Sequence, residues 1–326
     1  MRKLLIFVLV VVMVVGIFAM EKKGGVIILK ASDDHHKGYS TVEGLYLMAK
    51  LVEDWTNGRI KIEVYPGAVL GGEKETLEQT QMGVIDINRV SVAPLSAIYP
   101  KFSVFALPYI FKSREHMWKV LESDIGQGML HELKKVGLIG LAYMDSGARS
   151  FYTREKPILS PDDLKGLKIR TQKSPVMMDM VKAMGGNPVP MAFEEVYSAL
   201  QTGVIDGAEN NPPSYYETHH FEVAKYYSLD GHAMVPEILV MSLRTWNALS
   251  EQDRKIIQMA AIAAQELQRR LWLKDEQIAL QKVKESGCKI YHPDKAAFIK
   301  AVQPVYKKYA SKYMDLIKKI QEMGEE

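Results

Sequence analysis

The stretch Leu77-Glu-Gln-Thr-Gln-Met-Gly83-Val-Ile-Asp86 recurs further along the chain as Tyr197-Ser-Ala-Leu-Gln-Thr-Gly203-Val-Ile-Asp206. Each copy is typical of a helix that ends at a glycine able to adopt a positive φ and then leads into a strand. Because such junctions are common in α/β proteins, a chance recurrence is the alternative. We interpret the repeat as two similar lobes, each presenting the end of a strand to a cleft between them, where ligands of open α/β sheets bind.

Around the repeat, short apolar runs alternate with helical patterns, which is the rhythm of βαβ units. The apolar runs predict strands at 26–29, 60–65, 138–143, 167–169 and 187–189, and the helical patterns predict helices at 41–55, 73–82, 176–184 and 194–202. Two long helices are predicted to follow, one over 251–285 and one running from Asp294 towards Lys319. The sequence therefore predicts an α/β fold with long C-terminal helices.

The N-terminus has the layout of a secretory signal peptide. Arg2 and Lys3 precede an unbroken apolar run over 4–18, and Ala19 precedes the first polar residues. That run of about fifteen residues is shorter than the roughly twenty needed to span a bilayer, so an uncleaved anchor is the weaker alternative. We predict that residues 1–20 are a signal peptide, cleaved near Ala19, and that the protein is periplasmic. Cys288 is the only cysteine, so neither a lipoprotein anchor nor an internal disulfide is expected.

Composition excludes several classes of function. The formal net charge of +3 includes the two basic residues of the signal, so the mature chain is close to neutral and no nucleic-acid partner is expected. The sequence has no phosphate-binding loop, no His-Glu-x-x-His, no Gly-x-Ser-x-Gly and no cysteine pair. The adjacent pairs His35-His36 and His219-His220 project in different directions and are poorly placed to chelate together. We therefore expect no catalytic residue, no metal and no cofactor, and predict that the chain is not an enzyme.

The segment Leu164-Lys-Gly-Leu-Lys-Ile-Arg170 and the later segment from Pro190-Met-Ala-Phe193 to Gly-Ala-Glu-Asn210 resemble the signature region of one transporter family. Together with Leu70-Gly-Gly72 and Phe105-Ala-Leu-Pro108, they resemble the substrate-binding proteins of TRAP (tripartite ATP-independent periplasmic) transporters, the DctP-like family, over essentially the whole mature chain. The resemblance implies a two-lobe periplasmic-binding-protein-like (Venus-flytrap) fold bridged by long C-terminal helices. It also implies capture of a small organic acid for TRAP membrane subunits. The expected lobes are 24–147 plus 236–275, and 148–235 plus 276–326.

The resemblance places the arginine that grips the ligand carboxylate at Arg170. A guanidinium is a planar, permanently charged fork that can donate two parallel hydrogen bonds to a carboxylate, which supports this role. The alternative is that Arg170 pairs with a core acid. Arg149 resembles the second cleft arginine of the family, Asn210 its ligand-contacting asparagine and Phe193 its cleft aromatic. An ordinary ion pair, a turn residue and a core phenylalanine are the respective alternatives.

In the first lobe, the resemblance places Asp34 and His35, Glu73, and Ser91 on the cleft. With Gln172 they would form a polar rim around one carboxylate clamp. The predicted ligand-binding side chains are Arg170, Arg149, Asn210, Phe193, Glu73, Ser91, His35, Asp34 and Gln172.

A polar rim opposite a single clamp suits a polyhydroxylated acid, and the motifs look most like those of members that bind hexuronates or related sugar acids. The chain departs from the sialic-acid receptors at Ser91 and Lys173, so sialic acid is not expected. A C4-dicarboxylate or a 2-oxo or 2-hydroxy monocarboxylate remains the alternative ligand. A binding protein that serves a sensor remains the alternative role.

Overall fold

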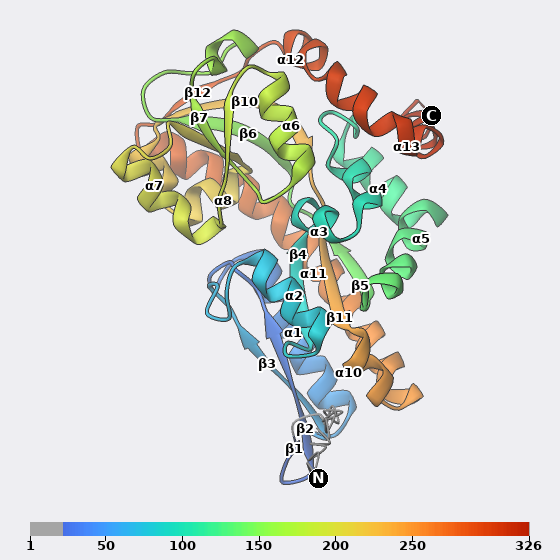
Figure 1. Cartoon of the computed structure of the whole chain (residues 1–326). Helices are drawn as coiled ribbons and strands as arrows, with labels where there is room; N and C mark the ends of the chain where they lie inside the picture. The colour runs from blue at the N-terminus through green and yellow to red at the C-terminus, as the bar shows by residue number, and fades with distance from the viewer. Residues whose placement is uncertain (1–21, 326) are drawn as a thin grey trace, which may run out of the picture.

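A computed structural model of the chain describes residues 22–325, so the predicted signal peptide lies outside the described residues. Within them the chain forms two six-stranded sheets flanked by helices, which confirms the α/β fold. Figure 1 shows the first sheet in the lower half of the molecule and the second in the upper half.

The strands of the first sheet are β1 (Lys22–Lys23), β2 (Val26–Ser32), β3 (Ile60–Tyr65), β4 (Ile87–Ser91), β5 (Leu138–Met144) and β11 (Glu237–Ser242). They run in the order β1-β2-β4-β11-β5, with β3 also paired to β2. The second sheet consists of β6 (Ala148–Thr153), β7 (Lys168–Thr171), β8 (Asn187–Pro190), β9 (Gly207–Asn210), β10 (Tyr226–Met234) and β12 (Lys289–Tyr291). Its order is β12-β10-β6-β9-β7-β8. The first five strands thus form one sheet and the next five form the other, and β11 and β12 then add one strand to each.

The sequence repeat is a structural repeat. Helix α2 (Glu73–Met82) ends at Gly83 with φ +81°, and α7 (Val196–Thr202) ends at Gly203 with φ +77°. Both glycines therefore adopt the left-handed conformation that the sequence predicted. The strands that follow, β4 and β9, lie between a parallel and an antiparallel neighbour in their respective sheets.

The aspartate that closes each copy of the repeat has the same role in both. Asp86 Oδ2 accepts the backbone N–H of Lys30 at 2.8 Å, and Asp206 Oδ2 accepts that of Lys168 at 2.7 Å. The N–H of each aspartate donates in return to the carbonyl of the same lysine, at 3.1 and 2.8 Å. Each repeat thus fixes its strand to the parallel neighbour, so that carboxyl ends of parallel strands lie at one edge of each sheet, where ligands of α/β proteins bind.

The remaining helices cover the sheets and connect the strands. They are α1 (Ser40–Trp55), α3 (Val92–Ile98), α4 (Arg114–Glu122), α5 (Asp124–Glu132), α6 (Pro175–Ala183), α8 (Pro212–Glu217), α9 (His220–Val223), α10 (Leu243–Ala248), α11 (Glu251–Glu285), α12 (Lys295–Ala301) and α13 (Gln303–Glu322). Short 3-10 helices are η1 (Pro100–Ala106), η2 (Leu133–Val136), η3 (Pro161–Leu164) and η4 (Phe193–Glu195).

The long C-terminal helices differ from the prediction in one respect. The helix predicted over 251–285 is confirmed as α11. The prediction of one helix from Asp294 towards Lys319 is wrong, because the chain breaks at Val302 between α12 and α13. Pro304, in the first turn of α13, has no N–H to donate to the carbonyl of Lys300, so α12 cannot continue through it.

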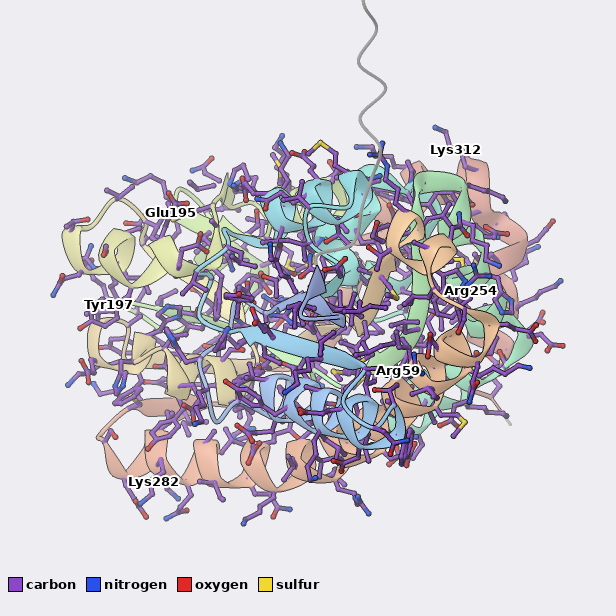
Figure 2. The ribbon with its side chains drawn as sticks, turned by 90° about the horizontal axis from the view of Figure 1, so that it is seen from below. Arg59, Glu195, Tyr197, Arg254, Lys282 and Lys312 are labelled. Carbon is purple, nitrogen blue, oxygen red and sulfur yellow. The ribbon has the colours of Figure 1, made fainter. Side chains whose placement is uncertain are left out.

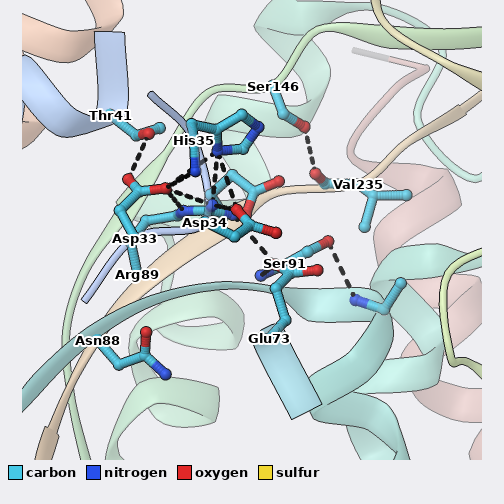
Figure 3. Close-up of polar contacts among 12 residues, drawn as sticks. Asp33, Asp34, His35, Thr41, Glu73, Asn88, Arg89, Ser91, Ser146 and Val235 are labelled. Atoms are coloured by element: carbon cyan, nitrogen blue, oxygen red, sulfur yellow. Dashed lines mark hydrogen bonds and ion pairs between the residues drawn. The ribbon is translucent and has the colours of Figure 1, made fainter. Parts of the chain in front are cut away.

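The chain passes between the sheets at residues 145–147, again at Val235-Pro236, and a third time along α11. The two extended crossings are tied together, because the Ser146 hydroxyl donates to the carbonyl of Val235 (Figure 3). Helix α11 packs on α1 and β5 beside the first sheet and on α8 beside the second. Figure 2 shows it along one side of the molecule, with Arg254 and Lys282 towards its two ends. The lobe limits predicted from the sequence remain a proposal, which this division of strands supports.

Helix α11 also contacts the first crossing directly. The side-chain amide of Gln268 accepts the backbone N–H of Asp145 at 2.8 Å and donates to its carbonyl at 2.8 Å. Asp145 in turn accepts the N–H of Gly147, which has φ +57°. A buried side chain of the long helix thus fixes the backbone where the chain leaves the first sheet.

Candidate ligand-binding site

A cavity lies between the two sheets, at the carboxyl ends of β2, β4, β7 and β9. Its lining residues are Asp34, His35, Glu73, Arg89, Arg149, Arg170, Gln172, Phe193, Asn210, Asn211, Ser214 and Glu237. All of the predicted ligand-binding residues except Ser91 are among them. A wider hollow borders the cavity at Asp34, His35 and Phe193 and opens to solvent.

Arg170, on β7, is the buried cation of this cavity that has no carboxylate partner. Its side chain is 2% exposed, and its Nε and Nη2 both donate to the carbonyl of Met191, at 3.0 and 2.8 Å. No ion pair joins it to a carboxylate of residues 22–325, and burial lowers its pKa. Burial and the neighbouring Arg170 charge also lower the pKa of His220 to about 3, so this histidine is neutral. Arg170 therefore provides positive charge that an anionic ligand can balance.

Arg149, unlike Arg170, has a buried carboxylate partner. From β6 it grips Glu209 of β9, with Nε to Oε2 at 2.6 Å and Nη2 to Oε1 at 3.0 Å. Although burial opposes ionisation, Arg149 and His232 lower the pKa of Glu209 to about 2. His232 is itself held by Asp230 at 2.9 Å. Arg149 lines the cavity as the sequence predicted, but its charge is balanced inside the protein by a buried carboxylate.

The first lobe contributes a cluster that the sequence analysis did not identify, centred on Arg89 of β4 (Figure 3). The Arg89 side chain is 1% exposed. Its Nε donates to Asp33 at 3.0 Å, and its Nη1 donates to Glu73 at 3.0 Å and to Glu237 at 2.8 Å. Its Nη2 donates to Asp33 and Asp34. One guanidinium thus holds four carboxylates around one side of the cavity.

Burial perturbs the ionisation of this cluster. The pKa of Glu73 is raised to about 8, mainly by burial and then by repulsion from Asp34. Burial likewise raises the pKa of Glu237. Asp33 behaves differently, because Arg89 and His35 hold its pKa below the ordinary value in spite of its burial. The cluster is therefore crowded with negative charge that Arg89 balances only in part.

Aromatic rings form a second kind of wall. The His35 ring stacks on Tyr39 with centroids 3.8 Å apart, and Phe193 lies 5.2 Å from His35. The Arg170 guanidinium lies 5.7 Å from the Phe193 ring. The face of an aromatic ring packs well against the C–H groups of a sugar ring. The hydroxyl groups at the edge of the sugar ring then stay free to form hydrogen bonds.

The remaining predicted residues have separate roles. Ser91 is fully buried; its Oγ accepts the N–H of Ala93 at 3.4 Å at the start of α3, and its own N–H donates to Glu73 at 2.7 Å. It therefore positions Glu73 and does not line the cavity. Gln172 is buried, and its Oε1 has no hydrogen-bond partner within residues 22–325. Asn210 accepts the N–H of Asn211 through its side-chain oxygen at 2.9 Å.

Asp33, Asp34 and His35 place ligand atoms within 4.8 Å of one another, a spacing that a metal ion could use. In this structure the Arg89 guanidinium contacts all three side chains. A permanently charged guanidinium already supplies the positive charge at this point. The expectation that the protein has no metal remains a prediction.

Three pairs of side chains connect the two lobes near the cavity. Tyr39 and Ser214 are hydrogen-bonded through their hydroxyls at 2.8 Å, and the Ser96 and Ser174 hydroxyls lie 3.4 Å apart. At the edge of the cleft, Lys173 Nζ lies 3.0 Å from Glu75 Oε1. The two lobes therefore touch around the cavity.

A polar cavity between two α/β lobes, with a buried arginine that lacks a carboxylate partner, defines a binding protein for a small anionic solute. The family model of bacterial extracellular solute-binding proteins, family 7, matches residues 31–312, and the chain belongs to this family. It is a solute-binding protein of the TRAP type, as the sequence predicted. No helix of residues 22–325 is both long enough and apolar enough to cross a membrane.

Proteins with similar sequences and structures match nearly the whole chain. A solute-binding protein of Chromohalobacter salexigens is 41% identical over 86% of this chain and 84% of its own length. The crystal structure of a TRAP solute-binding protein from Citrobacter koseri with bound D-glucuronate is 44% identical, with a TM-score of 0.88, over 90% of this chain and 98% of that one. A Xanthobacter autotrophicus protein with bound β-D-galacturonate is 39% identical, with a TM-score of 0.88, over 90% and 99% of the two chains.

Proposed function

We propose that this protein captures a hexuronate, such as glucuronate or galacturonate, outside the cytoplasm and delivers it to the membrane subunits of a TRAP transporter. The observation that carries the proposal is the pairing of one unbalanced buried cation, Arg170, with a wall of hydrogen-bond acceptors across the same cavity. A hexuronate has one carboxylate and several hydroxyl groups, which match these two sides. The similar structures with bound glucuronate and galacturonate support the same ligand class.

In this proposal each lining residue has a defined role. Arg170 donates two parallel hydrogen bonds to the ligand carboxylate, and Asn210 and Gln172 bond polar groups beside it. Asp34 and Glu73 accept hydrogen bonds from sugar hydroxyls. The remaining lining residues pack on the ring or fix these groups, and they include His35, Phe193 and Arg149.

Capture requires the lobes to swing together, because a small acid can be enclosed between two lobes only if the cleft opens and closes. The segments that cross between the sheets, around Gly147 and Val235, are the expected hinge. We further propose that residues 1–20 direct export and that the protein works in the periplasm as a binding protein without catalysis. Small-angle scattering should report compaction when the cognate acid is added, and identical profiles at saturation would contradict lobe closure.

A thermal-shift screen tests the ligand class. A ligand that binds only the folded state stabilises it by about 2.7 kcal/mol at one hundred times its Kd. Glucuronate and galacturonate are expected to raise the unfolding temperature more than succinate, malate, pyruvate or lactate. Neutral glucose and galactose should have no effect, because they leave Arg170 without a counter-charge. A shift caused by succinate or pyruvate, with inert uronates, would contradict the proposal.

A further inference from the structure

The two walls of the cavity carry opposite net charge. On the first-lobe side, the carboxyl groups of Asp33, Asp34, Glu73 and Glu237 surround the single guanidinium of Arg89. On the second-lobe side, two guanidinium groups, Arg149 and Arg170, accompany one carboxylate, Glu209. A ligand in this cavity therefore lies between an acidic wall, defined here as Asp34, Glu73 and Glu237, and a basic one.

Arg89 cannot act as a second carboxylate clamp. A guanidinium has five N–H donors. The Nε and Nη2 groups of Arg89 donate to Asp33, and the same Nη2 donates to Asp34. Nη1 supplies the remaining contacts, to Glu73 and Glu237. Because these contacts match the donor capacity of the side chain, Arg89 orients the carboxylates of the acidic wall and has no donor left for an anion.

The acidic wall keeps unused acceptors. Among residues 22–325, Asp34 receives hydrogen bonds and ion pairs only at Oδ1, Glu73 only at Oε1 and Glu237 only at Oε2. The other oxygen of each carboxyl group has no protein donor within that part of the chain. Ionised carboxylates accept hydrogen bonds and cannot donate them, so they are matched to hydroxyl groups and mismatched to another carboxylate. Because the pKa of Glu73 is raised to about 8, Glu73 is mostly protonated near neutral pH, and the negative charge of the acidic wall comes from Asp34 and Glu237.

We infer that the acidic wall is a selectivity element that accepts ligand hydroxyls and rejects a second carboxylate, so that the protein takes monoanionic sugar acids and excludes their dicarboxylate counterparts, the hexarates. The inference rests on the proposed function and refines it, because it assigns discrimination to Glu237 and Asp34 and not to the Arg170 clamp. Specificity of this kind combines an attractive feature for one ligand with a repulsive one for its competitor.

D-gluconate and D-glucarate provide a matched pair of ligands for the test. Both are open-chain sugar acids, and they differ at one end, which is a hydroxymethyl group in gluconate and a carboxylate in glucarate. Affinities of both, and of D-glucuronate, are measured by titration calorimetry at neutral pH. We expect glucarate to bind wild type at least about a hundredfold more weakly than gluconate, because like charges across a desolvated site are strongly unfavourable.

Glu237→Gln removes one charge of the wall and keeps a similar shape. It is expected to narrow the gluconate-to-glucarate affinity ratio by about tenfold or more, since the rejected carboxylate then meets an amide that can donate. Asp34→Asn is a second variant, in case Glu237→Gln does not fold, and should narrow the ratio in the same direction. Glu78→Gln is the matched control, because Glu78 lies on the same helix as Glu73 but is half exposed and outside the cavity; it should leave the ratio unchanged.

The outcomes separate the inference from the proposed function. If glucuronate binds but glucarate binds as tightly as gluconate, the selectivity inference is wrong and the proposed function stands. The inference is also wrong if neither acidic-wall variant changes the gluconate-to-glucarate affinity ratio. It is equally wrong if neither of these two open-chain acids binds. If none of the sugar acids binds to wild type, the proposed function itself is wrong.

Discussion

Methionine in place of Arg170 is predicted to abolish ligand binding without destabilising the ligand-free protein. Two charge-assisted hydrogen bonds to a ligand carboxylate are worth about 3–6 kcal/mol together, at about 1.5–3 kcal/mol each. Their loss corresponds to binding weaker by a factor between about a hundred and about ten thousand. Calorimetric titration of Arg170→Met with D-glucuronate measures this loss. An unchanged Kd in the folded variant would place the carboxylate clamp elsewhere.

The effect on stability follows from the surroundings of the side chain. Arg170 is buried beside Phe193 with no carboxylate partner among the described residues, and burial lowers its pKa, so its charge opposes folding. Losing its hydrogen bonds to the Met191 carbonyl costs about 1 kcal/mol each, which removal of the buried charge offsets. The ligand-free variant should therefore unfold in urea at a concentration no lower than wild type does.

Arg149→Met is the matched control within the same cavity. There the substitution leaves Glu209 buried without its partner, which lies 2.6 Å from Arg149 in the native protein. Breaking a buried ion pair on one side costs about 3–5 kcal/mol. Urea unfolding of the ligand-free proteins should thus show a loss of stability for Arg149→Met and none for Arg170→Met. Equal destabilisation by both would refute the distinction between a balanced and an unbalanced arginine.

Three further predictions concern the same site. Arg170→Lys keeps the charge but loses the fork, so D-glucuronate affinity should fall at least about tenfold in calorimetry, and an unchanged affinity would count against a bidentate clamp. Lys173→Met removes the 3.0 Å contact with Glu75 and should speed ligand dissociation by up to about fivefold in stopped-flow measurements at low salt, where an unaltered rate would rule out a contribution from this pair. The pKa of Glu73 is raised from 4.5 to about 8, mainly by burial, so the folded protein retains a proton that the unfolded chain loses. The free energy of unfolding of the ligand-free protein should therefore fall as the pH rises from 4.5 to about 8. This fall should be smaller for Glu73→Gln, and an identical pH profile for the variant would be inconsistent with a buried proton on Glu73.

Local patterns in the sequence were sufficient to predict most of the fold. Both copies of the repeat end their helices at a glycine with positive φ, and α2 and α11 have the bounds predicted from the sequence. The break between α12 and α13 was missed although Pro304 marks it, because the apolar periodicity continues through that proline.

The second-lobe part of the site was predicted from motifs, whereas the first-lobe cluster depends on long-range pairing. Arg89 was missed although it lies two residues before Ser91 on the same strand and hence on the same face. Its partner Glu237 is distant in sequence and reaches it because β11 pairs with β4, which places Glu237 opposite Ser91. In the same way, the pairing of β6 with β9 is what allows Arg149 to bond Glu209. Strand neighbours of this kind are not encoded in any local pattern.

Calorimetric titration of the purified mature protein with D-glucuronate, alongside D-glucose and succinate, tests directly whether the cavity selects a monoanionic sugar acid. Glucose lacks the carboxylate that Arg170 requires, and succinate presents a second carboxylate to the acidic wall. We expect saturable binding of glucuronate with one site per chain and no measurable binding of glucose or succinate. Tighter binding of glucose or succinate than of glucuronate would contradict this expectation.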